Sequence, residues 1–407
     1  MGFPIILTLI LLTLFNYKTC RDMRYPPFLA SALWLAALTL YYLRPISIDS
    51  ISILTPLIFV TVVLSFTWGG QISFFFHRRK PENIDGPAGL LKSRVKLIFL
   101  VVSLVLLPAV FERANSIAMG TSLLDWFTAL RVELTLDEQS PYGVLGNASI
   151  LSYCTTLIYA IELRDDWKEK LQYYLSLAIS VAYAVLSTGR TPILLIVVSV
   201  MAIAAMRHRL KWRNVFVGVL SLSLAFAIFA VILGKGGNVE SSVSDNLNSV
   251  RESMAQYAIG PIAAFDRLVR ADPAFEYGRN TFLEGVNLVR RLTGFALVSP
   301  IQEEVNVPFP VNVYTAVQPP FKDFGIVGVV LAFGLIGAVS TYFYLRAVEG
   351  EELYIFCYSL ILFPLFFMTF SDQYFAPVGS WIKYFLAGYL YFRYRDAVGA
   401  SLPVSGN

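Results

Sequence analysis

Charged residues are scarce in this 407-residue chain. Asp, Glu, Lys and Arg make up 15% of it, whereas a soluble domain carries roughly 25%. Hydrophobic residues make up 56%, and the mean hydropathy is +0.63. This balance argues against a soluble enzyme and indicates a membrane protein. The net charge of +4 is too small to indicate a nucleic-acid partner, and is better explained by the basic residues that orient membrane spans.

Cysteine and histidine are nearly missing. Three cysteines, Cys20, Cys154 and Cys357, lie far apart, which predicts neither a disulfide framework nor a thiolate metal site. The two histidines, His77 and His208, fall in basic loops and are not expected to be catalytic. Patterns such as HExxH, CxxC, Walker and GxGxxG are absent from the sequence, as is a DxD-like carboxylate pair. We therefore expect no metal or other cofactor and no soluble nucleotide-sugar donor.

Long apolar segments, in contrast, recur along the chain. A spanning helix needs about 20 apolar residues, and about eleven segments approach this length between charged residues. The N-terminal segment has no basic region before it, so it is expected to be a retained span. The sequence thus predicts an all-α polytopic membrane protein. The expected spans are 2–16, 27–43, 51–76, 95–111, 144–162, 171–188, 192–206, 214–233, 324–346, 353–370 and 380–393.

Basic residues cluster in alternate loops, which orients these spans. Residues 18–24, 78–96, 164–170 and 207–213 hold half of the lysine and arginine, and such loops face the cytoplasm. The N-terminus is then expected in the periplasm and the C-terminus in the cytoplasm. The predicted location is a bacterial inner membrane, with the lipid bilayer as an obligatory partner.

The predicted organisation has three parts: spans one to eight in 1–233, a large periplasmic loop in 234–322, and three spans with a short tail in 323–407. Residues about 112–143 form a second periplasmic loop. Within the large loop, 251–270 and 281–296 have apolar residues at helical spacing. Both stretches are expected to form helices that lie on the membrane surface.

Arginine dominates the cations expected on the periplasmic side, where the only lysines are Lys235 and Lys322. A guanidinium binds phosphate oxygens through two parallel hydrogen bonds, whereas an ammonium acts as a point charge. The bias therefore indicates a phosphate or pyrophosphate ligand; alternatively, the arginines pair with the loop's acidic residues on a solvated surface. The arginines are Arg113, Arg131, Arg190, Arg251, Arg267, Arg270, Arg279, Arg290 and Arg291.

Arg190 is the sharpest single candidate because it lies between two apolar spans. A charge at membrane depth costs roughly 2.5–3.5 kcal/mol, so it usually has a partner or a function. Gly189 is expected to end the preceding helix, and Pro192 suits the first turn of the next. Arg190 would then face a periplasmic cavity, or simply extend to the interface.

Any general base on this side must be a carboxylate, because histidine is not expected there. Each carboxylate taken alone is more often structural than catalytic. The candidates are Glu133, Asp266, Asp272, Glu276, Glu284, Asp323 and Asp372.

Three stretches resemble the Wzy-type oligosaccharide repeat unit (O-antigen) polymerases. They are LSTGRTPILLIVV at 186–198, the Arg267-to-Gly278 spacing followed by Arg279, and Asn312-Val-Tyr-Thr leading to Lys322-Asp323-Phe324-Gly325. The resemblance implies a fold similar to the membrane-embedded C-type glycosyltransferases. It also implies a metal-independent, inverting transfer between polyprenyl-pyrophosphate-linked oligosaccharides, with a chain-length-determining co-polymerase as a further partner.

The resemblance assigns roles to particular residues. Arg190, Arg267 and Arg279 are expected to hold the departing pyrophosphate, and Glu276 or Asp323 to orient or deprotonate the acceptor hydroxyl. The expected substrate-binding residues are Arg270, Arg290, Arg291, Tyr277, Gly278 and Tyr314.

Two other functions fit a polytopic chain of this kind. An O-antigen ligase moves finished polysaccharide onto a lipid core, but it is expected to need a periplasmic histidine. A flippase or transporter would use its arginines to line a path for an anionic lipid-linked glycan. Transporters often contain two similar halves, and no internal repeat is visible here.

Overall fold

The computed structural model describes residues 2–43, 48, 50–77, 89–118, 123–136, 142–207, 218, 258–300, 302–307 and 309–401. The described part of the chain is almost entirely helical, and its only sheet is an antiparallel pair, β1 (Val305–Asn306) with β2 (Pro310–Val311). This confirms an all-α architecture. The expected span at 214–233 lies outside the described residues, apart from residue 218.

Ten of the eleven expected spans coincide with helices. Ordered along the chain, the helices are α1 (Gly2–Cys20), α2 (Pro26–Leu43), α3 (Leu54–Phe76), α4 (Gly89–Ile117), α5 (Leu123–Leu136), η1 (Gly143–Gly146), α6 (Asn147–Ile161), α7 (Trp167–Leu186), α8 (Arg190–Arg207), α11 (Leu283–Thr293), α12 (Gln318–Val348), α13 (Glu352–Phe367) and α14 (Val378–Ser401). Residues 258–271 form a further helix.

Six of these helices are long and apolar enough to cross a bilayer by length and composition. They are α1, α2, α3, the Val95–Ile117 part of α4, the Gly143–Ile161 segment and α12. Two shorter apolar helices lie at Thr191–Arg207 and Glu352–Phe367. Their surfaces carry many exposed large hydrophobic side chains, which water would not favour. A lipid environment accounts for that exposure.

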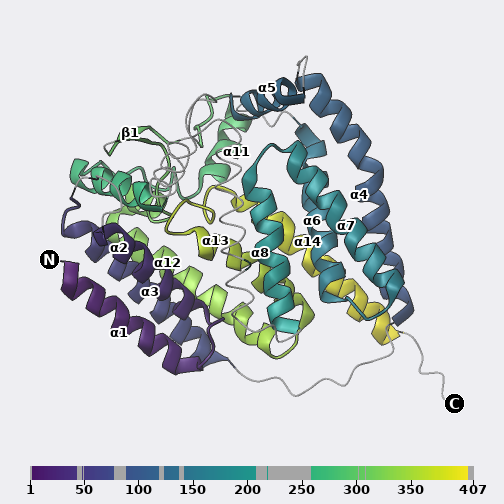
Figure 1. Ribbon diagram of the computed structural model, residues 1–407, viewed down its shortest axis with the longest axis horizontal. Helices are drawn as coiled ribbons and strands as arrows, with labels where there is room; N and C mark the ends of the chain where they lie inside the picture. Colours follow the sequence, from purple (N-terminus) through teal and green to yellow (C-terminus); the bar gives the residue numbers. More distant parts are fainter. Residues whose placement is uncertain are drawn as a thin grey trace, which may run out of the picture. The chain divides into compact units, whose positions relative to one another are not determined.

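The chain forms two compact units, each assembled from separate stretches of sequence. Unit 1 comprises residues 1–77, 212–345 and 361–378, and unit 2 comprises 78–211, 346–360 and 379–407. Unit 1 therefore contains α1, α2, α3, the 258–271 helix, α11, the strand pair, most of α12 and the end of α13. Unit 2 contains α4 to α8, the start of α13 and α14. Figure 1 shows the helices of each unit.

In unit 1, close backbone contact joins α3 to α12. A Cβ on Gly69 would lie 1.8 Å from the carbonyl oxygen of Gly334, and one on Gly337 would lie 2.2 Å from that of Phe66. These glycines let the two helices approach where larger residues would separate them. Buried polar side chains add a second link, since Asn16 of α1 donates to Thr67 of α3 at 3.0 Å.

The two ends of unit 1 differ in character. At one end, the turn between α1 and α2 carries Arg21 and Arg24, and Tyr344 near the end of α12 donates to Asp22 of this turn at 2.8 Å. We call this the basic end. Burial opposes ionisation of Asp22, but hydrogen bonds from Arg24 and Tyr344 more than offset it, so the pKa of Asp22 is lowered.

The opposite end of unit 1 gathers the start of α3, the 258–271 helix and the start of α12. Phe265 contacts Phe59 of α3 and Phe321 of α12, with ring centroids 5.3 Å apart in each pair. Both α3 and α12 run from this end to the basic end. The arginines expected to form the functional site in unit 1 therefore lie at the end opposite the basic turn.

Unit 2 is joined by buried polar contacts. Lys96 of α4 is 3% exposed and pairs with Glu169 of α7 at 2.8 Å and with Glu162 after α6 at 3.6 Å. Tyr391 of α14 donates to Glu162 at 2.9 Å. A buried ammonium needs such partners because an unpaired charge is costly in a protein interior. This cluster therefore connects four segments of unit 2.

Two sequence expectations need correction. The 251–270 stretch was expected on the membrane surface, but most of its described part is buried in unit 1, with Ile262 and Phe265 at 0% exposure. Neighbouring Ala263 and Ala264 are small enough to bury the other side of the helix too. Gly189 was expected to end α7, but the helix ends at Leu186, and Thr188 takes the left-handed conformation at φ 50°.

Candidate functional site

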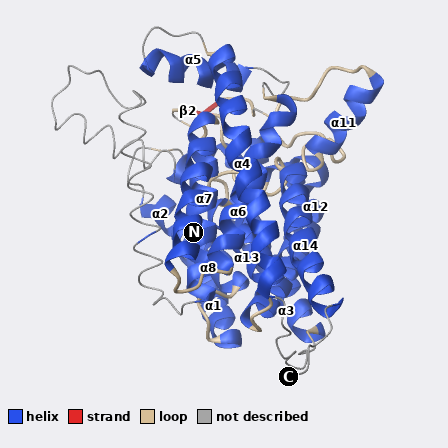
Figure 2. Cartoon of the chain, turned by 90° about the vertical axis from the view of Figure 1, so that its right-hand side faces the viewer, coloured by secondary structure: helices blue, strands red, loops and turns tan. Residues whose placement is uncertain are grey.

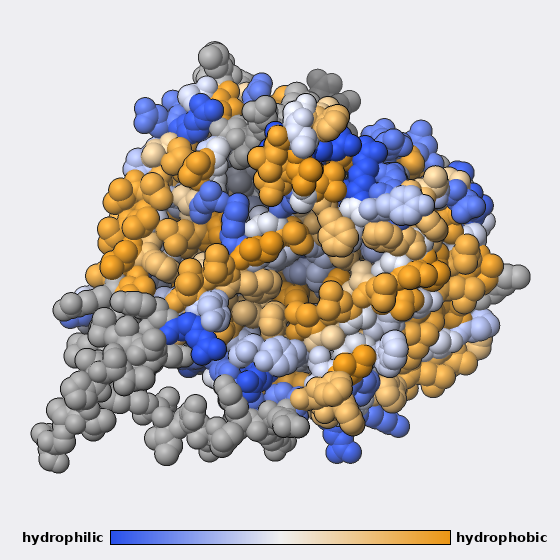
Figure 3. Space-filling view, turned by 180° about the vertical axis from the view of Figure 1, so that it is seen from behind, coloured by the Kyte–Doolittle hydropathy of each residue, from blue (hydrophilic) through white to orange (hydrophobic). Residues whose placement is uncertain are grey.

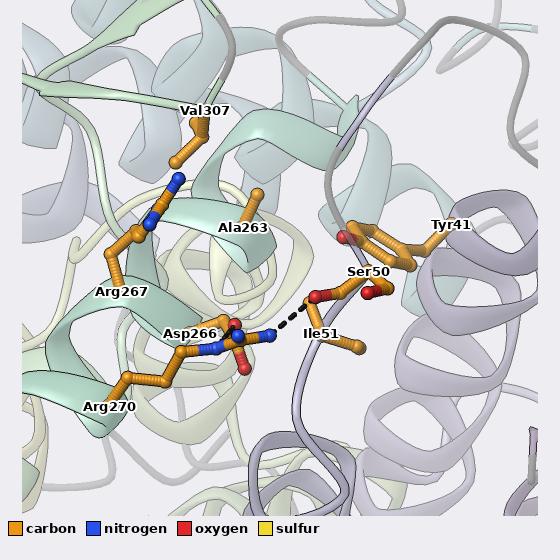
Figure 4. A pocket seen from close by; sticks show the side chains of 8 residues that line it. All are labelled: Tyr41, Ser50, Ile51, Ala263, Asp266, Arg267, Arg270 and Val307. Carbon is orange, nitrogen blue, oxygen red and sulfur yellow. Dashed lines mark hydrogen bonds and ion pairs between the residues drawn. The ribbon is translucent and has the colours of Figure 1, made fainter.

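A polar pocket lies at the end of unit 1 opposite the basic turn. Its volume is about 150 Å³. The lining residues come from α2, the 48–52 segment, the 258–271 helix and the stretch following β1; they are Tyr41, Ser50, Ile51, Ala263, Asp266, Arg267, Arg270 and Val307. Figure 4 shows their side chains.

Asp266 fixes the 258–271 helix beside α3. It is 4% exposed, and one carboxylate oxygen accepts from the Ser52 amide at 2.7 Å, the Ser52 hydroxyl at 2.8 Å and the Thr55 hydroxyl at 2.7 Å. The other oxygen accepts from Arg270 Nε at 2.6 Å. A buried carboxylate with four donors is well compensated. Asp266 thus positions the helix, and with it Arg267 and Arg270.

Arg267 and Arg270 bring two guanidinium groups to one pocket. They stand three residues apart on the helix, so they share one side of it. In Figure 4 the Arg270 side chain reaches towards Ser50, whose carbonyl oxygen accepts a hydrogen bond from it, whereas the Arg267 side chain points towards Val307. Arg270 pairs with Asp266 at 2.6 Å. Two guanidinium groups at one pocket suit an anionic ligand.

A second polar cluster forms where residues 276–281 meet the start of α12. The backbone amides of Glu276 and Tyr277 donate to the carbonyl oxygens of Lys322 and Asp323, both at 3.2 Å. Tyr277 and Gly278 have positive φ values of 49° and 95°. Such a backbone is uncommon for tyrosine, and strained residues of this kind concentrate at functional sites. The structure thus brings together two of the stretches that the sequence singled out.

Asp323 is the anchor of this turn. It is 0% exposed and accepts from the Asn280 amide, from Asn280 Nδ2 at 2.8 Å and from the Thr281 amide at 2.6 Å. These bonds occupy both of its oxygens. Glu276 and Asp323 are the two carboxylates proposed as a general base. Of the two, Asp323 has surroundings that fit a positioning role.

Glu276 is more accessible and lies among cations. Lys322 Nζ lies 2.8 Å from Glu276 Oε1, and Arg279 lies 3.7 Å from Oε2, with half of the Arg279 side chain exposed. Asn280 also donates to this carboxylate at 3.3 Å. A carboxylate, two cations and an exposed tyrosine therefore meet beside a glycine turn, and this set can hold both a hydroxyl and an anion.

Gly325 interrupts α12 directly after this cluster. Its φ of 61° and ψ of −147° are not helical, and only glycine adopts this region readily. The short helix before it carries Lys322 and Asp323, and the span proper follows from Ile326. Discontinuous helices in membrane transporters expose backbone groups that bind ligands.

The remaining candidate residues are placed differently. Arg190 begins α8 and belongs to unit 2. Tyr314 is buried, and its hydroxyl donates to the Glu303 carbonyl at 3.2 Å. Arg290 and Arg291 lie in the last turn of α11, where Arg290 donates to the Ala296 carbonyl at 2.6 Å.

Sequence reasoning missed the contribution of the segment between α2 and α3. Ser50, Ser52 and Thr55 complete the surroundings of Asp266 and the pocket. Hydroxyl residues directly before a span were a possible signal, but they are common at helix starts, so nothing in the sequence linked them to a residue more than 200 positions away.

The residues that the structure describes offer little support for a metal-ion site. Among the described residues, no group of three or more His, Cys, Asp or Glu side chains is arranged to hold a metal ion. The charged groups that do converge are arginine and lysine with single carboxylates, and these recognise anions.

Comparison with family models, curated proteins and solved structures gave no match to this chain.

Proposed function

We propose that this protein is a membrane-embedded glycosyltransferase that joins oligosaccharide repeat units carried on polyprenyl pyrophosphate. The observation that carries the proposal is the pair of guanidinium groups, Arg267 and Arg270, at a pocket beside the start of a membrane helix. Pyrophosphate is the anionic group that a lipid-linked sugar would present at this level of the bilayer. Arginine is the side chain best suited to bind it.

The sidedness of the proposal follows from the distribution of charge in unit 1. Arg21 and Arg24 lie at the basic end, and basic turns between spans favour the cytoplasm. The pocket and the Glu276 cluster belong to the opposite end, which is then periplasmic. The proposed protein spans the inner membrane about eleven times, as a C-type glycosyltransferase-like fold would.

The proposed reaction is an inverting transfer between two lipid-linked saccharides. A hydroxyl oxygen of one repeat unit attacks the anomeric carbon of the growing chain, and the bond from that carbon to the pyrophosphate oxygen breaks. The electron pair leaves with the polyprenyl pyrophosphate, and the hydroxyl proton passes to a carboxylate. Negative charge grows on the leaving group in the transition state, so preplaced guanidinium groups lower the barrier.

Particular residues take these roles in the proposal. Arg267 and Arg270 hold the departing pyrophosphate at the pocket, and Arg190 and Arg279 stay separate candidates for binding it. Glu276 accepts the proton or orients the hydroxyl, because it is more accessible than Asp323. Its cationic neighbours, Lys322 and Arg279, hold the carboxylate in place beside the turn.

Chain-length analysis in cells tests this function. Arg267→Ala is expected to leave the protein in the membrane and to reduce the long-chain surface polysaccharide to a single repeat unit. Arg267→Lys should rescue poorly because an ammonium cannot form the two parallel hydrogen bonds. Arg164→Ala, in the exposed turn between α6 and α7, is the matched control and should give normal polysaccharide. Normal chain length in Arg267→Ala would reject the proposed role of the pocket arginines.

A further inference from the structure

Helix α11 has a broad apolar side that faces away from the protein. Leu288 and Val289 are each 60% exposed, and Leu292 is 80% exposed. Phe282 before the helix and Phe295 after it are also exposed. At 100° per residue, these side chains and Gly285 occupy one side of the helix, whereas Glu284, Asn287, Arg290 and Arg291 occupy the other.

The polar side chains Asn287 and Arg290 bond to the segment that follows α11, and Leu283 is the one buried residue of the helix. Asn287 exchanges two hydrogen bonds with Val298, at 2.9 Å and 2.8 Å, and Arg290 donates to the carbonyl oxygen of Ala296. A surface helix in water normally shows the reverse arrangement, with its apolar stripe on the core. Most of the apolar side of α11 faces away from the protein, so the helix fits an apolar environment outside it.

Helix α11 starts where a membrane span begins. The Thr281 amide, two residues before α11, donates to Asp323 near the start of α12. Beyond Gly325, α12 exposes Val327, Leu331 and Leu335, each more than 60% exposed, as expected of a helix facing lipid. Figure 2 shows α11 standing out beyond α12, and Figure 3 shows the face on which it projects, with hydrophobic side chains exposed.

Length and charge define the kind of contact. Eleven residues of helix extend about 16 Å, which is too short to cross a bilayer of about 30 Å. The helix carries two adjacent arginines in its last turn and one glutamate in its first. An amphipathic helix with these properties fits the headgroup layer, with its arginines near lipid phosphates.

We propose that α11 is an interfacial helix. It lies in the headgroup region of the leaflet next to the pocket end of unit 1, with Leu288, Val289 and Leu292 among the acyl chains. The exposed Arg291 contacts lipid phosphate. This inference requires the membrane but not glycosyl transfer, so it stands or falls independently of the proposed function.

Spin labelling tests the orientation directly. Single cysteines replace Leu292 on the apolar side and Arg291 on the polar side, in a full-length background in which Cys20, Cys154 and Cys357 are changed to serine or alanine. Each labelled protein is reconstituted in vesicles of phosphatidylethanolamine and phosphatidylglycerol. Power saturation then compares collisions with oxygen, which concentrates in the acyl region, against collisions with a water-soluble nickel chelate.

The expected result is a several-fold higher oxygen-to-nickel collision ratio at Leu292→Cys than at Arg291→Cys. Equal and high nickel accessibility at both positions would show that α11 lies in water and would overturn the proposal. A Leu292→Cys label shielded from both reagents would overturn it too, because it would show that another protein surface, such as a second copy of the chain, covers this side.

Discussion

Asp266 on the 258–271 helix accepts a 2.7 Å hydrogen bond from the hydroxyl of Thr55 at the start of α3, across 211 positions of sequence. With the two bonds from Ser52, this contact holds the arginine-bearing helix against a membrane helix. The pocket therefore depends on a carboxylate that is itself nearly inaccessible. Its main role is to position Arg267 and Arg270.

Asp266→Asn should destabilise the protein more than its size suggests. The amide that replaces one carboxylate oxygen would turn N–H groups towards either Arg270 or the hydroxyls, and each buried donor left without an acceptor costs about 1–3 kcal/mol. Thermal unfolding in detergent measures the effect. Asp272→Asn is the matched control, because Asp272 is exposed and asparagine tolerates its positive φ. Equal melting temperatures for the two variants would contradict the positioning role.

Gly325→Ala should disturb the cluster at the start of α12. Its backbone conformation is nearly restricted to glycine, and an added Cβ would lie 3.1 Å from the Phe275 ring. The strain is expected to cost on the order of 1–3 kcal/mol and to displace Lys322 and Asp323 relative to residues 276–281. Melting temperature and transferase activity should both fall.

Gly285→Ala provides the comparison. Gly285 lies inside α11, and nothing lies within 4 Å of an added Cβ. Alanine is the better helix former by about 0.5–1 kcal/mol, so this variant should be neutral or slightly more stable. If Gly325→Ala and Gly285→Ala had the same melting temperature, the conformation at position 325 would not require glycine.

The sidedness of unit 1 can be measured with a membrane-impermeant maleimide. Glu304→Cys places an exposed thiol near the strand pair, and Lys18→Cys places one at the basic end, each in a Cys20→Ser background. We expect Glu304→Cys to react in cells with a permeabilised outer membrane, and Lys18→Cys to react only after lysis. The reverse pattern would invert the topology and remove the periplasmic site.

Sequence periodicity predicted the helices well because lipid-facing segments need continuous apolar runs. Periodicity was less reliable for residues 112–143, which were expected to form a second periplasmic loop, because α5 forms within them. It predicted a helix near 281–296, and α11 occupies Leu283–Thr293. For 251–270 the same pattern wrongly predicted a helix on the membrane surface. Small alanines allow burial on sides of this helix that hydropathy alone does not identify as buried.

The candidate site was predictable only in part. Arginine spacing drew attention to Arg267 and to Gly278, and the structure shows that the Gly278 turn meets Lys322 and Asp323. It also shows Arg267 and Arg270 at one pocket. The sequence did not indicate that Ser52 and Thr55 would bind Asp266, because long-range polar contacts depend on packing between helices. The sequence also did not distinguish Glu276 from Asp323 as the candidate base. In the structure, Asp323 is fully buried and Glu276 is partly exposed.

Reconstitution tests the central claim most directly. Purified protein in proteoliposomes receives polyprenyl-pyrophosphate-linked repeat units without an ion gradient, and the glycan products are resolved by length. The account predicts a ladder of longer products with the unaltered protein and with Arg164→Ala, and only single repeat units with Arg267→Ala. Unchanged substrate with the unaltered protein, or an undiminished ladder with Arg267→Ala, would contradict it.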